Sequence, residues 1–201
     1  MNGAYIFMAF TTNEILERME AHIVKLDGNL THVKRVLLLG KLIAEKENMA
    51  YDNDVLTFAA YFHDIAAYPQ YASAYRGSFD HALESSRLAP DIAKDYGYSD
   101  TQIEVIVEAV KYHDKPGMGE HNETRLIRNA DGIDYIGYIA VARDFVKFPK
   151  DMKKAMEMIR TRKAAFGALI DLVSAKILAV PRIAELDNFI ERFEEETFGI
   201  Y

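Results

Sequence analysis

Residues 58–66 of the chain read FAAYFHDIA, and this stretch guides the interpretation of the whole sequence. It is apolar apart from His63 and Asp64, and a carboxylate on an apolar face costs free energy unless a partner satisfies it. Adjacent helical side chains point about 100° apart, so they do not normally share a partner. If the helix ends near Ala66, both side chains can reach one ion placed off its end. The stretch therefore predicts a helix that ends in a pair of metal ligands.

Further polar residues on apolar helical faces accompany this pair. Two such residues lie on stripes with helical spacing. His32 shares one stripe with Val36, Leu39 and Ile43, and Asp131 shares another with Ile127, Asp134 and Tyr138. Taken singly, an inward histidine is more often a hydrogen-bonded core residue, and such an aspartate a cap or a salt-bridge partner. Together, in the order His32, His63-Asp64, Asp131 on separate helices, they indicate one metal site. Imidazole and carboxylate ligands suit Mn, Fe, Co, Ni or Zn more than Ca.

Helical periodicity dominates the sequence, and strand alternation is hard to find. We expect helices over about 12–25, 31–47, 52–66, 80–90, 99–113 and 123–145, and two or more after Pro149. Their expected starts are Thr31, Asp52, Asp80 and Ser99, the last with Gln102 at capping-box spacing. Proline disrupts a helix interior, so Pro90 should end or kink a helix and Pro181 should break one. The sequence predicts a single all-α domain over residues 1–201.

The amino-acid composition of the chain excludes several classes of function. The chain has 201 residues, of which 50% are apolar, enough for one good core. A net charge of −7 argues against general nucleic-acid binding, although a metal ion would still allow a small anionic substrate. The absence of cysteine excludes disulfides, thiolate zinc sites and cysteine nucleophiles. The first ten residues, MNGAYIFMAF, lack a charged signal-peptide region, and the apolar run 164–180 carries Asp171 and Lys176. We therefore expect a cytoplasmic protein without a membrane span.

Over about residues 28–145 the chain resembles the HD-domain superfamily of metal-dependent phosphohydrolases. The segments that carry the resemblance are LTHVKRV at 30–36, AAYFHDIA at 59–66 and IRNADGIDYIGYIAVARDF at 127–145. The third is similar to stand-alone microbial HD hydrolases with an A-D-x-x-D-x-x-G pattern, which are described as nucleotide or nucleotide-like phosphohydrolases. The resemblance implies an HD-domain helical bundle with His32, His63, Asp64 and Asp131 as metal ligands. The helices at about 150–198 would be additional to it.

The resemblance also implies a reaction, in which metal-bound water attacks a nucleotide or another small phosphate ester. We predict Asp64 and Asp134 as catalytic residues. Asp134, one turn after Asp131, would orient a histidine ligand or the attacking water. The alternative for Asp134 is a salt bridge on the helix surface.

The sequence departs from the superfamily directly after the His-Asp pair. Many members continue with Ile-Gly-Lys, whereas this chain has Ile-Ala-Ala at 65–67 and lacks the lysine. Arg35, Arg76 or Lys115 would have to supply the positive charge, and we predict Arg35 and Lys115 as substrate-binding residues. The alternatives are an internal ion pair for Arg35 and a solvated loop position for Lys115.

His81 and His113 extend the pattern, in the segments SFDHALESSRLA and EAVKYHDKPGMG. In two-metal members of the superfamily, histidines at such positions hold the second ion, which here would make both residues metal ligands with Asp64 as the bridge. Alternatively, they would line the substrate phosphates around a single ion. The expected cofactor is one or two divalent metal ions per chain, Mn, Fe, Co, Ni, Zn or Mg.

Three residues receive no site role from the sequence. Arg143 lies 12 residues after Asp131, about 120° away on an unbroken helix, so a structural role is expected. His22 and His121 are expected to be ordinary surface residues.

Two other functions stay open beside hydrolysis of a small phosphorylated substrate. One is a di-iron oxygenase that uses the same six ligands. The other is a non-catalytic helical module that binds a metal or a nucleotide. We expect no general nucleic-acid partner and no membrane partner, and a homodimer is compatible with the sequence.

Overall fold

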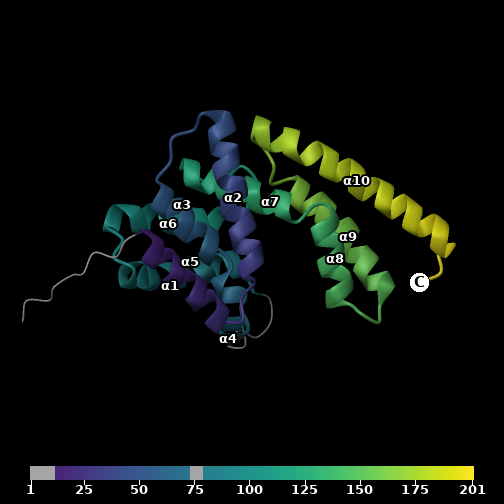
Figure 1. The fold of residues 1–201 in the computed structure, drawn as a ribbon, viewed down its shortest axis with the longest axis horizontal. Coiled ribbons are helices and arrows are strands. Elements are labelled where there is room, and N and C mark those ends of the chain that lie inside the picture. The colour runs from purple at the N-terminus through teal and green to yellow at the C-terminus, as the bar shows by residue number, and fades with distance from the viewer. Residues whose placement is uncertain (1–11, 73–78) are drawn as a thin grey trace, which may run out of the picture.

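The computed structural model describes residues 12–72 and 79–201, and within them it contains helices and no strand (Figure 1). The all-α prediction is therefore confirmed. The helices are α1 (Thr12–Lys25), α2 (Leu30–Glu47), α3 (Asn53–Phe62), a 3-10 helix (Ile65–Ala67), α4 (Pro69–Ala72), α5 (His81–Asp95), α6 (Asp100–Tyr112), α7 (Asn122–Asp134), α8 (Tyr138–Lys147), α9 (Met152–Gly167) and α10 (Val173–Thr197).

The central helix is α7, which packs against α2, α6 and α9. Nearly every residue of α7 is buried, polar ones included. The main core gathers around it, with fully buried side chains from five helices: Ile23, Val36, Phe58, Ile106 and Ile127. A polar residue on α7 is thus held inside the protein, which is where a ligand such as Asp131 has to be.

Local capping chemistry explains most helix starts. Asp52 and Asp80 cap α3 and α5 through their carboxylates, and Ser99 forms a reciprocal capping box with Gln102 at the start of α6. The cap predicted for α2 was two residues too late. Asn29, not Thr31, caps that helix, by accepting the His32 backbone N–H at 3.1 Å.

The predicted helix over 123–145 is wrong, because it is two helices. Gly137 separates α7 from α8 with φ 95° and ψ −168°, a conformation that is essentially restricted to glycine. Tyr138 therefore does not continue the apolar stripe of Asp131 and is instead exposed. The break turns α8 back toward the metal-ligand residues.

Pro90 and Pro181 do not end helices, since each lies inside one, α5 and α10 respectively. The predicted break at Pro181 is wrong. The proline removes a hydrogen bond to the Ile177 carbonyl, but both residues are exposed, so water can satisfy that carbonyl.

Helices α8, α9 and α10, here called the α8–α10 arm, extend to one side of the core and carry the C terminus at their far end (Figure 1). The arm has a small apolar cluster of its own, in which the buried residues are Val141, Met156, Ile159 and Leu186.

No helix among the described residues is long and apolar enough to span a bilayer. The N-terminal stretch MNGAYIFMAF and Arg76 lie outside the described residues.

Candidate metal centre

The four core ligand candidates converge from three helices. His32 comes from α2, His63 and Asp64 from the end of α3, and Asp131 from α7. The His32 Nε2 lies 3.3 Å from both the His63 Nε2 and the Asp131 Oδ1, and His63 Nε2 lies 3.6 Å from that same oxygen. The structure thus brings together all four residues that the sequence singled out.

The end of α3 explains how two adjacent residues face one point. The helix proper stops at Phe62, His63 is its C-cap, and Asp64 leaves the helical conformation with φ −106° and ψ 16°. The His63 Nε2 then lies 3.6 Å from the Asp64 Oδ2. A helix end was predicted for this reason, although near Ala66 rather than at Phe62.

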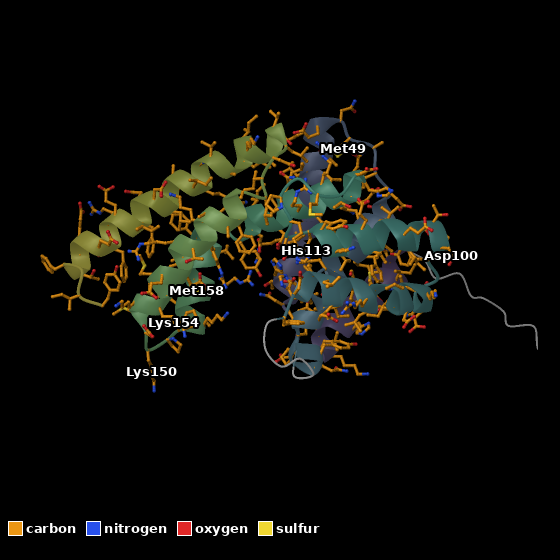
Figure 2. All side chains as sticks on the ribbon, turned by 180° about the vertical axis from the view of Figure 1, so that it is seen from behind. Met49, Asp100, His113, Lys150, Lys154 and Met158 are labelled. Carbon is orange, nitrogen blue, oxygen red and sulfur yellow. The ribbon has the colours of Figure 1, made fainter. Side chains whose placement is uncertain are left out.

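His81 and His113 meet the other oxygen of Asp64. The His81 Nε2 lies 3.2 Å and the His113 Nε2 3.3 Å from the Asp64 Oδ1. Asp64 therefore turns one oxygen toward His63 and the other toward the pair His81 and His113. Figure 2 shows His113 in the interior, where the α8–α10 arm meets the core.

Hydrogen bonds fix which ring nitrogen points into the cluster. The Nδ1 atoms of His63 and His113 lie 3.0 Å and 2.7 Å from the carbonyl oxygens of Ala60 and Val110. A carbonyl oxygen only accepts, so each Nδ1 carries a proton, and in the neutral form of each ring the Nε2 presents a lone pair. His32 is held in the same way, with its Nδ1 2.7 Å from the Asp134 Oδ2.

These atoms fit a divalent metal ion. Lone pairs and carboxylate oxygens converge, and buried Asp64 Oδ1 and Asp131 Oδ1 accept no hydrogen bond. Bonds to such ions are about 2.0–2.2 Å, which places ligand atoms on one ion roughly 3.0–3.5 Å apart, close to the separations above. Among the residues that the structure describes, three overlapping groups have ligand atoms within 4.8 Å of one another: His32, His63 and Asp64; His63, His113 and Asp131; and Asp64, His81 and His113.

The negative charge of the buried carboxylates also favours a bound cation in the cluster. Burial alone would lower the pKa of His32, but the adjacent carboxylates of Asp131 and Asp134 outweigh burial and raise that pKa to about 9. Burial would also lower the pKa of His113, but the adjacent carboxylate of Asp64 outweighs burial and raises that pKa to about 9. The carboxylates therefore attract positive charge, which either protons on the rings or a metal ion can supply.

Asp134 is buried behind the cluster and is not part of a surface salt bridge. Besides His32, it accepts hydrogen bonds from Arg35, whose Nε and Nη2 lie 2.6 Å and 2.8 Å from its two oxygens. Burial would raise the pKa of Asp134, but Arg35 and His32 hold it at about 2. The carboxylate thus stays ionised and orients the His32 ring. Arg35 is engaged in an internal ion pair.

A groove crosses the cluster between the core and the α8–α10 arm. Two adjoining cavities of about 520 and 620 Å³ form it, and both are lined by Asp64, Ala67, Tyr135, Lys147 and Arg162. The groove passes Ala67, where the sequence lacks the lysine of many relatives. Lys147 from α8 and Arg162 from α9 face it from the other side.

Arg143, for which the sequence predicted a structural role, also lines this groove. Because Gly137 breaks the helix, the position of Arg143 no longer follows from an unbroken turn. Its Nη2 donates to the Tyr135 hydroxyl at 3.2 Å, and its Nη1 lies 3.7 Å from the Asp134 Oδ2. Its guanidinium also stacks over the Tyr135 ring, 4.6 Å from the centroid.

The remaining candidates lie at the edge or outside. Lys115 is half-exposed and pairs with Asp80 and Asp114, both at 3.2 Å. Of the two histidines expected at the surface, His121 is exposed, whereas His22 is partly buried beside Phe62. Neither belongs to the cluster.

Sequence reasoning missed Asp114, Lys147 and Arg162. A signal existed for Asp114, since His113-Asp114 repeats the His-Asp dipeptide, and its Oδ2 lies 3.9 Å from the His81 Nε2. No local signal marks Lys147 or Arg162, because only the packing of the arm brings them to the groove.

Comparisons with known proteins bear on the fold. Residues 29–136 match the HD domain. The chain is 27% identical over 85 residues to a protein of Clostridium beijerinckii, a match that spans 42% of this chain and only about half, 52%, of that relative.

Solved structures of two proteins are similar to nearly the whole chain. One is Bacillus subtilis YpgQ, with a TM-score of 0.73 and 19% identity over 96% of this chain and 100% of that one. The same protein is also known in complex with ADP, and that structure matches with a TM-score of 0.69 at 19% identity over 95% of this chain and 100% of that one. The other is a predicted HD superfamily hydrolase from an uncultured Thermotogales bacterium, with a TM-score of 0.61 and 22% identity over 92% of both chains. These likenesses show a common fold.

Proposed function

Because this chain belongs to the HD-domain family, we propose that it is a metal-dependent phosphohydrolase that acts on a nucleotide or another small phosphate ester. The first ion would be held by His32, His63, Asp64 and Asp131. A second would be held by His81 and His113, with Asp64 as the bridge, because the two oxygens of Asp64 face different histidines.

The observation that carries the proposal is that the two walls of one groove bear different kinds of side chain. Histidines and aspartates line one wall. The other wall, from the α8–α10 arm, carries the cations Arg143, Lys147 and Arg162, of which Arg162 pairs with Asp144. A phosphate group carries negative charge on several oxygens and is bound well by cations on both sides. A groove of this kind suits a phosphorylated compound better than a neutral one.

The chain's own residues have distinct parts in this scheme. Asp134 and the carbonyls of Ala60 and Val110 fix the imidazole rings, so that each Nε2 is presented as a ligand. When bound, a divalent metal ion lowers the pKa of a water molecule and offsets charge on the phosphoryl group. Arg143 and Arg162 would hold the remaining phosphate oxygens by charge-assisted hydrogen bonds.

For the two cations predicted from the sequence, the geometry favours different roles. Lys115 lies at the rim near His81 and is kept as a proposed phosphate contact. Arg35 would have to leave Asp134 to bind substrate, so we assign it to holding Asp134 instead. The ADP complex of YpgQ, which shares this fold, supports a nucleotide as the substrate class.

The test combines metal analysis with a substrate panel. Chelator-treated protein is reloaded with Mn²⁺, Co²⁺, Ni²⁺, Zn²⁺, Fe²⁺ or Mg²⁺, and phosphate and pyrophosphate release is measured from nucleotides and sugar phosphates. We expect turnover only with metal, and loss of both turnover and bound metal in His63→Ala and Asp64→Ala. The matched control is His22→Ala, which lies outside the cluster. Wild-type metal content and rate in either ligand variant would refute the proposal.

The same metal-loaded protein distinguishes a phosphohydrolase from the two alternative functions. A di-iron oxygenase would contain iron, absorb in the visible region and consume oxygen. A non-catalytic module would bind metal or nucleotide without turning over any phosphate ester.

A further inference from the structure

A separate cavity of about 570 Å³ lies between α2, the start of α8 and α10. It is here called the α2–α10 pocket, and its lining includes Arg35, Leu38, Leu42, Ile139, Pro181 and Arg182. Small-molecule sites are typically about 300–1,000 Å³, so the pocket is of the size that takes a metabolite. It adjoins the metal centre through Asp134, which lines the pocket, and through Ile139, which lines both the pocket and the groove.

The walls of the pocket are apolar and lack a partner within the described chain. Leu38 is 67% exposed, Leu42 37% and Ile139 49%, although all three are large hydrophobic side chains. Scattered apolar residues are ordinary on a protein surface, but here they line one concave site together. They would gain free energy from an apolar ligand body.

One end of the pocket carries two arginines, Arg35 and Arg182, and a single carboxylate, Asp134, whereas Glu185, the other carboxylate of the lining, pairs with the Tyr138 hydroxyl. Of its two arginines, Arg35 is neutralised by Asp134. Arg182 is partly buried and donates its Nη1 to the Ile133 carbonyl at 3.0 Å, and no ion pair joins it to a carboxylate in the part of the chain that the structure describes. Burial lowers the pKa of Arg182, and nearby Arg35 lowers it further, although Asp134 opposes both, so one carboxylate faces two guanidinium groups at this end of the pocket.

From the apolar walls and the guanidinium of Arg182, we infer that the α2–α10 pocket binds a small amphipathic anion. Its carboxylate or phosphate headgroup pairs with Arg182, and its apolar body packs against Leu38, Leu42 and Ile139. Ile139 lines both sites, but Leu38, Leu42 and Arg182 do not line the metal groove, so this inference stands apart from the proposed phosphohydrolase activity.

The probe is decanoate, kept below its micelle concentration and titrated into the full-length protein by calorimetry. We expect one saturable site per chain. Because a hydrogen bond to a charged group contributes about 1.5–3 kcal/mol, Arg182→Ala should weaken binding about tenfold or more. Arg192→Ala is the matched control, an exposed arginine of the same helix outside the pocket. It should bind decanoate like the wild type.

A second variant keeps the test decisive if Arg182→Ala does not fold. Leu38→Asp places a negative charge on an exposed wall position and should also weaken decanoate binding about tenfold or more. Decyl phosphate, titrated in parallel, identifies the preferred headgroup, and tighter binding of either anion supports the inference. Decyltrimethylammonium has the same apolar body with the opposite charge. Any of three results would overturn the inference. The first is that decyltrimethylammonium binds as tightly as decanoate, and the second is that neither anion binds. The third is that Arg182→Ala or Leu38→Asp binds both anions as tightly as the wild type does.

Discussion

Asp134 acts on the metal centre from a position behind its ligands. It accepts from the His32 Nδ1 and from two nitrogens of Arg35, so its ionised carboxylate sets both the tautomer and the orientation of the His32 ring. A side chain with the same shape but no charge would remove that constraint and leave every ligand in place. The carboxylate is therefore expected to influence metal affinity without touching the ion.

For this reason we predict that Asp134→Asn lowers metal affinity by about 10- to 100-fold, the usual cost of losing a partner that orients a ligand. Competition with a chromogenic chelator measures the affinity. Asp187→Asn, an exposed aspartate of α10 that pairs with Lys163, is the control and should bind metal normally. An unchanged affinity in Asp134→Asn would show that Asp134 does not position His32.

The two oxygens of Asp64 lead to a prediction about stoichiometry. Because the Oδ1 faces His81 and His113 while the Oδ2 faces His63, we expect two ions per chain. His81→Ala and His113→Ala should then reduce the metal content from near two to near one, as measured by elemental analysis. A wild-type value near one that neither variant changes would instead indicate a single ion, with both histidines available to the substrate.

At the scale of elements, the break at Gly137 determines what the groove contains. It separates α7, which carries Asp131, from α8, which carries Arg143. The backbone of Gly137 has φ 95° and ψ −168°, which an L side chain adopts only at a cost. The position of one groove cation therefore depends on a residue that lacks a side chain.

We predict that Gly137→Ala destabilises the protein by about 1–3 kcal/mol and raises KM for the phosphorylated substrate. Urea unfolding and steady-state kinetics measure the two effects. Gly167→Ala is the matched control, because Gly167 is the last residue of α9 and an added Cβ there meets no atom within 4 Å. If both variants behaved alike, the conformation of Gly137 would not be the cause.

The elements that could be predicted from the sequence depend on nearby residues. Asp52 and Ser99 cap helices through bonds to residues two or three positions away, so their patterns are readable in the chain. The break at Gly137 was missed because apolar residues continue at helical spacing on both sides of it. Arg162 was missed because α9 reaches the groove through tertiary packing, which no local spacing encodes.

At the scale of the whole molecule, the groove lies between two groups of helices that pack unequally. The core wall belongs to the large hydrophobic core, whereas the other wall belongs to the α8–α10 arm with its small cluster. In Figure 2 the turn at Lys150 lies far from the core. Of the 25 residues of α10, only Ser174, Ala175, Ala179 and Leu186 are buried. Little apolar surface therefore fixes the arm.

This unequal packing should be visible in the exchange of amide protons with deuterated solvent. Regions with few buried contacts open first, without unfolding of the whole protein. The free energy of opening for peptides from 183–197 should therefore be lower than that for peptides from α7, by on the order of a few kcal/mol. Mass spectrometry of timed samples measures both. Equal protection of the two regions would mean that the protein opens as one unit. If the arm does open alone, a substrate held by Arg143 and Arg162 should act as a clasp that slows exchange in α8 and α9 far more than in α7.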